Sequence, residues 1–126
     1  MSWNYFSYEL DSKLACSCCG HRGMDDDFMQ KLDAFRERIG VPLQVTSGYR
    51  CPLHNSNVSS TGETGPHTTG RAVDIRVPNS RARHLIMKYA LSDDGFTRVT
   101  PAKSFIHIDD LTIEDGFDEE VMWWYG

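Results

Sequence analysis

A carboxylate interrupts an apolar segment of this chain, and that feature limits the fold more than any other. Residues 70–77, GRAVDIRV, are typical of a mostly buried strand, yet Asp74 stands in the middle of them. Aspartate is depleted in strands, and burying a carboxylate without a partner is costly. We therefore expect something to compensate Asp74. His67 lies seven residues earlier, in the loop sequence GPHTTG, and is the first candidate partner.

A second segment with polar residues, SFIHIDDL at residues 104–111, also predicts a strand. Strand side chains alternate between the two faces of a sheet. We therefore expect Phe105, His107 and Asp109 to share one face, with the two isoleucines on the other. Asp110 is expected to face the other way and to lie at the surface.

Two interpretations of His67, Asp74 and His107 remain open at this point. Two histidines and one carboxylate are a usual ligand set of catalytic zinc, with the fourth position left for water. A bound metal would also explain why an aspartate is tolerated in the strand. In the other interpretation, His67 is an ordinary loop histidine and Asp74 is a hydrogen-bonded strand carboxylate.

The other patterns predict an α+β fold. Residues 24–40 and 79–95 are expected to form helices, and the first repeats its apolar residues at helical spacing: Phe28, Leu32, Phe35 and Ile39. Residues 43–50 predict a short strand, and the turn-rich residues 51–66 predict a loop. There is no βαβ repeat with a Gly-rich phosphate loop, so we expect a small, mostly antiparallel sheet flanked by helices. The aromatic tail, residues 121–126, is expected to pack back on the body.

Composition narrows the class of protein and its partners. The 126 residues fit one domain, residues 1–126, and are 40% hydrophobic and 25% charged. The formal net charge of −5 opposes nucleic-acid binding, which usually relies on a strongly basic surface. No apolar run approaches the roughly 20 residues of a membrane span, and the N-terminal sequence does not resemble a secretory signal. We expect a monomer made in a cytoplasm, with no membrane or nucleic-acid partner.

Four cysteines, Cys16, Cys18, Cys19 and Cys51, allow two interpretations. In a cytosolic protein such clusters are more often metal ligands or reduced thiols than a disulfide framework. A structural zinc could take Cys16, Cys18 or Cys19, His21 and Cys51, although these do not form a clean CxxC pair. Reduced, packed thiols are the interpretation that we favour from the sequence.

A wider pattern extends over most of the chain. It consists of three motifs in order: TSGYRCPLHN, GPHTTGRAVDI and FIHIDD. Together they resemble the zinc D-Ala-D-Ala carboxypeptidase family, which includes bacteriophage peptidoglycan endopeptidases, over about residues 5–110. The family has a histidine, then Gly-x-Ala-x-Asp, then a distant strand histidine; here these are His67, Gly70, Ala72, Asp74 and His107. The resemblance implies a fold shared with the Hedgehog signalling domain. It also implies Zn²⁺ bound by the two histidines and the aspartate.

The resemblance also implies roles for residues near the metal. Arg50 matches the arginine of the family's SGYR motif, where a guanidinium suits a substrate carboxylate or a developing oxyanion. Some members place their general base two or three residues before the last ligand, where this chain has Phe105 and Ser104. Asp109 is therefore the residue expected to act as base; the alternative is that it orients a histidine ligand. Glu63 is a more remote candidate for the base.

The resemblance implies a zinc peptidase that hydrolyses peptide bonds in the peptidoglycan stem peptide, as a D-Ala-D-Ala carboxypeptidase or an endolysin-type endopeptidase. Encoded by a phage or prophage, it would be made in the bacterial cytoplasm without a signal peptide. It would reach the cell wall after release or as part of a phage particle. Two other functions stay open: a catalytically idle zinc-binding module of the same fold, and a structural or assembly protein of a phage particle. We expect His54 to have a structural or supporting role.

Overall fold

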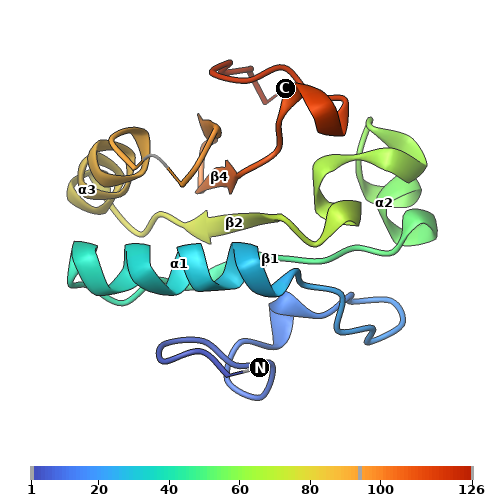
Figure 1. The fold of residues 1–126 in the computed structure, drawn as a ribbon, viewed down its shortest axis with the longest axis horizontal. Helices are drawn as coiled ribbons and strands as arrows, with labels where there is room; N and C mark the ends of the chain where they lie inside the picture. The colour runs from blue at the N-terminus through green and yellow to red at the C-terminus, as the bar shows by residue number, and fades with distance from the viewer. Residues whose placement is uncertain (1, 94, 126) are drawn as a thin grey trace.

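The computed structural model describes residues 2–93 and 95–125, and its centre is a four-stranded antiparallel sheet (Figure 1). The strands lie in the order β1-β2-β4-β3 and comprise β1 (Val45–Ser47), β2 (Ala72–Arg76), β3 (Arg98–Pro101) and β4 (Phe105–Asp109). This arrangement confirms the predicted α+β class and the three strands expected from the sequence. Strand β3 was not predicted.

Three α-helices accompany the sheet: α1 (Asp26–Ile39), α2 (Pro52–Val58) and α3 (Ser80–Leu91). Both predicted helices are confirmed, one or more residues shorter at each end; Asp94 of the second prediction lies outside the described residues. The side chain of Asp25 accepts a hydrogen bond from the backbone N–H of Phe28 and begins α1. Gly40 ends α1 in the left-handed conformation, with a φ of 74°.

The prediction of a loop over residues 51–66 is wrong in part, because helix α2 lies inside it. The Cys51 sulfur accepts a hydrogen bond from the N–H of His54 at the start of the helix, and Pro52 occupies the first turn. The buried amide of Asn55 donates to Thr61 Oγ1 over 2.8 Å and so folds the following turn back onto the helix. Polar residues hid this helix in the sequence, since it has no apolar stripe.

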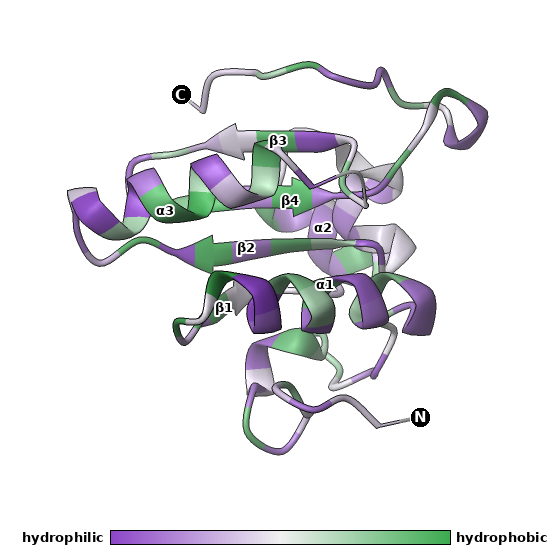
Figure 2. Ribbon diagram, turned by 60° about the vertical axis from the view of Figure 1, so that its left-hand side comes forward, coloured by the Kyte–Doolittle hydropathy of each residue, from purple (hydrophilic) through white to green (hydrophobic). Residues whose placement is uncertain are grey.

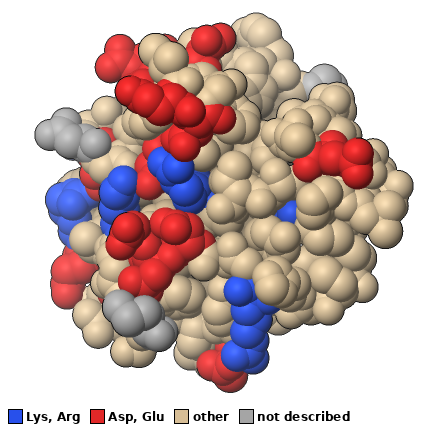
Figure 3. Space-filling model, turned by 45° about the vertical axis from the view of Figure 1, so that its right-hand side comes forward, with Lys and Arg blue, Asp and Glu red and all other residues tan. Residues whose placement is uncertain are grey.

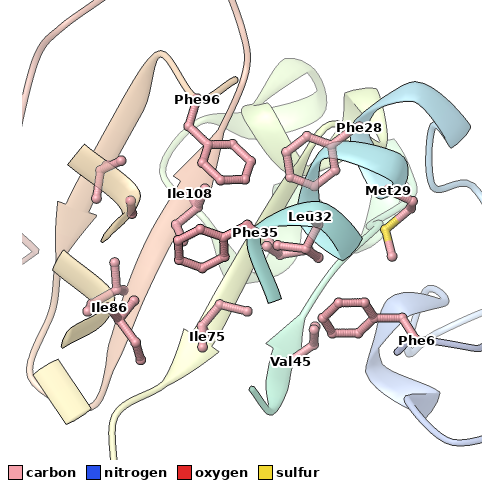
Figure 4. Packing of buried hydrophobic residues seen from close by; sticks show 14 of the residues in the cluster. Phe6, Phe28, Met29, Leu32, Phe35, Val45, Ile75, Ile86, Phe96 and Ile108 are labelled. Carbon is pink, nitrogen blue, oxygen red and sulfur yellow. The ribbon is translucent and has the colours of Figure 1, made fainter. Parts of the chain in front are cut away.

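The apolar face of the sheet packs against α1 and α3. Ile75 of β2 and Ile108 of β4 point to this face, and Figure 4 shows them beside Phe35 of α1. In Figure 2 the colour of β2 changes between hydrophobic and hydrophilic along the strand, because core-facing and site-facing residues alternate. The buried core comprises Phe6, Leu14, Phe28, Met29, Leu32, Phe35, Ile39, Val45, Val73, Ile75, Ile86, Ala90, Phe96, Val99, Ile106 and Ile108.

The opposite face of the sheet carries the polar residues, and the strand register brings them together. Asp74 of β2 pairs with His107 of β4, which in turn pairs with Thr100 of β3. Ala72 and Arg98 flank Asp109 in the same way. Each of these pairs lies one residue from an apolar pair on the core face, so the two-residue period of the strands separates core from site.

The two ends of the chain lie on opposite sides of the sheet, the N-terminal segment below β1 and the C-terminal segment above β4 in Figure 1. The predicted packing of the tail is confirmed for Trp123, whose ring centroid lies 5.1 Å from that of His107, and for Tyr125, whose ring lies 5.0 Å from that of Phe105. Trp124 points to solvent and is 97% exposed. Gly126 lies outside the described residues.

The prediction that Asp110 lies at the surface is wrong, because this side chain is buried. Its Oδ2 accepts from Lys31 Nζ over 2.7 Å, and its Oδ1 accepts from Arg71 Nε over 2.8 Å. The strand ends at Asp109, so the alternation of faces no longer applies to the next residue. Two basic side chains, from α1 and from the turn before β2, then cover the carboxylate.

The face drawn in Figure 3 carries charges of both signs close together. Acidic and basic side chains gather on one half of this face, while the other half is largely uncharged. This face therefore has no broad basic surface. In the described part of the chain, no helix has the length and apolar character needed to span a bilayer.

We predict that Gly70→Ala destabilises the protein more than Gly62→Ala. Both glycines have a positive φ, 76° and 72°, so alanine costs about 1–2 kcal/mol at either position. A Cβ at Gly70 would also lie 2.1 Å from the Gly23 carbonyl oxygen, whereas no heavy atom lies within 4 Å of one at Gly62. Urea unfolding at saturating zinc should show at least about 2 kcal/mol of additional loss for Gly70→Ala. Equal losses would contradict this packing.

Candidate metal centre

His67 is fixed by the short 3₁₀ turn Pro66–Thr69 and by one backbone carbonyl. Its ring Nδ1 lies 2.7 Å from the carbonyl oxygen of Gly48, which only accepts hydrogen bonds. The proton therefore resides on Nδ1, and Nε2 keeps a free lone pair. This Nε2 lies 3.3 Å from Oδ1 of Asp74.

His107 is held in the complementary way by a carboxylate. Its Nε2 lies 2.7 Å from Asp109 Oδ2, and its Nδ1 lies 3.1 Å from Asp74 Oδ1. In the neutral ring, a proton on Nε2 leaves Nδ1 free to coordinate. Each ring is thus anchored through one nitrogen, and both present the other nitrogen to the same oxygen of Asp74.

These three donor atoms fit a zinc ion. Around a tetrahedral metal with bonds of about 2.0–2.1 Å, neighbouring ligand atoms lie about 3.3 Å apart, and the two separations from Asp74 Oδ1 are 3.1 Å and 3.3 Å. All three side chains are buried: Asp74 lies on β2, His107 on β4 and His67 in the turn before β2. The structure therefore brings together His67, Asp74 and His107 as a group that can bind a metal.

The pKa shifts of the group reflect this packing. Burial lowers the pKa of His67, and the adjacent Asp74 carboxylate offsets this only in part. Burial also disfavours a charge on His107, but hydrogen bonds to Asp109 and Asp74 outweigh it and raise the pKa of this ring. Burial alone would raise the pKa of Asp74; the adjacent rings of His107 and His67 reverse the effect and hold this pKa far below its ordinary value. Asp74 is thus ionised throughout the neutral range.

Arg50 lies beside the ligand group. Its Nε donates to Ser47 Oγ over 3.2 Å, one NH group donates to Asn55 Oδ1 over 3.0 Å, and the other lies 3.7 Å from Asp74 Oδ2. The side chain is 15% exposed, so its guanidinium edge remains accessible. Tyr49, in the same SGYR motif, packs its ring against His21.

A cavity of about 770 Å³ opens over the ligand group. Its walls come from α2 and the turns after it, from the polar face of the sheet, and from the C-terminal segment. His54 lines this cavity. Glu63 is exposed and does not line the cavity. The described residues that line the cavity are Ser17, Thr46, Ser47, Arg50, His54, Val58, Ser59, Ser60, Thr61, Pro66, His67, Asp74, Arg98, Phe105, His107, Phe117, Trp123, Trp124 and Tyr125.

Sequence reasoning missed Arg98, which lies behind His107. Its Nε lies 3.1 Å from Asp109 Oδ2, an ion pair that lacks hydrogen-bond alignment. Its guanidinium carbon lies 4.8 Å from the ring centre of Phe117 and 4.7 Å from that of Trp123. A prediction of strand β3 from the sequence would have pointed to Arg98, because the strand register places this residue opposite Asp109.

Asp109 is fully buried, and both of its oxygens have partners. Oδ2 accepts from His107 and faces Arg98, while Oδ1 accepts from the backbone N–H of Leu111 over 3.1 Å. The carboxylate lies on the far side of the His107 ring from Asp74, since the two carboxylates contact different ring nitrogens. It is in contact with a predicted ligand and is not among the cavity-lining residues.

Comparison with known families agrees with this geometry. The sequence model of the family described as Peptidase M15 matches residues 4–109. The chain belongs to the peptidase M15 family. This membership implies a metallopeptidase that depends on zinc, and the matched range contains all three candidate ligands, Arg50 and Asp109. No curated protein matches the chain.

We predict that zinc binding to the metal-free protein releases a proton from His107 and therefore weakens as the pH falls. The raised pKa keeps this ring protonated at pH values where an ordinary imidazole, with a pKa of about 6.5, has lost its proton. The ligand must be neutral, so affinity should fall by up to about tenfold per pH unit below that pKa. Asp109→Asn removes one of the two carboxylates that raise the pKa of His107, so it should reduce the proton release near neutral pH.

The measurement is isothermal titration calorimetry of zinc into chelator-stripped protein, in buffers with different ionisation enthalpies. The comparison between wild type and Asp109→Asn cancels protons released from groups elsewhere in the chain. Equal proton release from the two proteins at neutral pH would contradict the assigned pairing of His107 and Asp109.

Proposed function

We propose that this protein is a zinc-dependent peptidase that cleaves peptide bonds in the peptidoglycan stem peptide, as a D-Ala-D-Ala carboxypeptidase or an endolysin-type endopeptidase. One observation carries the proposal: the His67, Asp74 and His107 donor atoms converge beneath a cavity that Arg50 also lines. Membership of the M15 family supports the reaction class. We further propose that it acts on the cell wall after release from the bacterial cytoplasm or as part of a phage particle.

The residues of the chain prepare this reaction. When bound, a zinc ion lowers the pKa of coordinated water and polarises the scissile carbonyl. The Gly48 carbonyl and the Asp109 carboxylate keep the two histidine rings in the tautomers that coordination requires. Buried Asp74 supplies the single negative charge of the ligand set. Trp123 covers one side of His107 and excludes water from it.

Arg50 is the group that we propose to contact the substrate. Stem peptides end in carboxylates, and hydrolysis develops negative charge on the carbonyl oxygen; a guanidinium can bind either. Ser47 and Asn55 hold the guanidinium through Nε and one NH group, which orients the side chain before substrate arrives. The nearby carboxylate of Asp74 keeps the arginine close to the ligand group.

The proposal is tested by digestion of a defined muropeptide with zinc-loaded protein and mass spectrometry of the products. Release of terminal D-alanine would establish a carboxypeptidase, and internal cleavage would establish an endopeptidase. His67→Ala should abolish turnover because it removes a proposed ligand. No cleavage of muropeptides or of intact peptidoglycan by the zinc-loaded protein would overturn the proposal.

Arg50→Lys is the matched variant for the same assay. Lysine keeps the charge but loses the planar fork that a carboxylate or oxyanion meets. We expect kcat/KM to fall by about tenfold or more, which corresponds to one charge-assisted hydrogen bond, while zinc content and melting temperature stay near those of wild type. Unchanged kinetics would assign Arg50 to the turn alone.

The contacts of Asp109 support the second of its two predicted roles, the positioning of His107. Both of its oxygens are already hydrogen-bonded, and the side chain is fully buried, which leaves no surface toward the cavity. We therefore propose that Asp109 orients the ring and that the proton acceptor lies elsewhere. Among the described residues that line the cavity, His54 is the one histidine outside the ligand group, and imidazole is a common general base.

Asp109→Asn separates the two roles. If Asp109 positions His107, the variant should bind zinc about 10–100-fold more weakly, and saturating zinc should restore turnover. If Asp109 is the base, turnover should stay about 10²–10⁴-fold low at every zinc concentration. Turnover is therefore measured as a function of free zinc for wild type and variant. A persistent defect at saturation would contradict the positioning role.

One observation favours a second candidate function, an idle zinc-binding module of the same fold. Among the described residues that line the cavity, Asp74 is the only carboxylate, so a free acidic base is lacking. In that case the protein would bind zinc and muropeptide but release no product. The digestion experiment decides between the two candidates, and zinc content separates both from a structural protein of a phage particle.

A further inference from the structure

All four cysteines of the chain meet at one point outside the site already described. Their four sulfurs lie within 4.8 Å of one another. Three come from the short loop at residues 16–19, and the fourth comes from Cys51, the residue that begins α2. Cys18 Sγ lies 3.5 Å from Cys16 Sγ and 3.3 Å from Cys51 Sγ.

We propose that Cys16, Cys18, Cys19 and Cys51 bind a second zinc ion as four thiolates. Structural zinc sites take four ligands in a tetrahedron, and Cys₄ is one of the common sets. With zinc–sulfur bonds of about 2.3 Å, tetrahedral sulfurs lie about 3.8 Å apart. The two separations from Cys18 Sγ, 3.5 Å and 3.3 Å, are near that value and exceed the roughly 2.05 Å of a disulfide, and all four sulfurs lie within 4.8 Å of one another. His21, considered as a ligand from the sequence, packs against Tyr49 outside the cluster.

Backbone groups around the sulfurs have the arrangement that such a site requires. The N–H of Cys51 donates to Cys16 Sγ over 3.3 Å, and the N–H of His54 donates to Cys51 Sγ over 3.4 Å. Donors of this kind stabilise and orient metal-bound thiolates. The loop closes through a bond from the N–H of Gly20 to the Cys16 carbonyl over 2.8 Å, with Gly20 at a φ of 75°.

The site would join two parts of the chain that build the peptidase cavity. Cys51 follows Arg50 directly and precedes the helix that carries His54. Two backbone bonds, from Gly48 to Lys13 and from Tyr49 to Leu14, already connect the same segments. Four thiolates leave no open coordination position, so the role of this zinc is structural: it fixes the turn that presents Arg50. The two metal sites share no ligand.

The test is elemental analysis of the full-length protein, purified under reducing conditions without chelator. We expect two zinc ions per chain in wild type, one in Cys18→Ser/Cys19→Ser and one in His67→Ala. The control His21→Ala should keep two. The cysteine variant should also melt at a lower temperature than wild type, whether or not the protein cleaves peptides, so failure here and failure of the proposed function are distinguishable.

Cobalt reconstitution of the wild-type protein gives an answer even if the cysteine variant fails to fold. Stripped protein loaded with two equivalents of Co²⁺ should show the intense thiolate-to-cobalt charge-transfer bands of a tetrahedral tetrathiolate site. Their absence would overturn the proposal. So would a wild-type zinc content of one that His67→Ala reduces to zero, or an intact mass that shows a disulfide in freshly purified protein.

Discussion

The whole arrangement depends on one buried carboxylate that faces two imidazole nitrogens. Asp74 is 6% exposed and lies within 3.3 Å of both rings. A charge buried in this way is tolerated only when partners surround it. Two separate acceptors, a backbone carbonyl and a second carboxylate, hold those rings from behind. The site is thus organised by the protein itself before any metal is considered, as a group that can bind one.

The sheet makes this arrangement possible because one of its faces packs in the core and the other carries the ligand group. The core face packs isoleucines and valines against α1 and α3, and these contacts fix the register of β2 and β4. A slip of one residue would bury Asp74 in the core and expose Ile75, so the core determines the pairing of Asp74 with His107. Stability and function are therefore coupled through strand register, although they use opposite faces. The C-terminal segment then covers the site through Trp123, which packs against His107.

Much of the fold could be predicted because its signals are local. The apolar spacing of α1 and the alternation in β4 follow from short-range rules, and the structure confirms them. Helix α2 and strand β3 could not be predicted in this way. Helix α2 has no buried apolar stripe, since Leu53 and Val58 are exposed, and it begins with the cap by Cys51. Strand β3 is short, and it is defined by its pairing with β4. Asp110 was misplaced because its burial depends on Lys31 and Arg71, which are distant in sequence.

The three candidate ligands were found because each stands in a recognisable motif, whereas Arg98 and the meeting of the four cysteines depend on tertiary contacts.

The most direct test of the metal centre is anomalous diffraction at the zinc edge from crystals of the zinc-loaded protein. The account predicts an ion at about 2.0–2.2 Å from Nε2 of His67, Oδ1 of Asp74 and Nδ1 of His107. The opposite ring nitrogens should still contact the carbonyl of Gly48 and the carboxylate of Asp109. Coordination through those opposite nitrogens, or no anomalous peak between the three side chains, would contradict it.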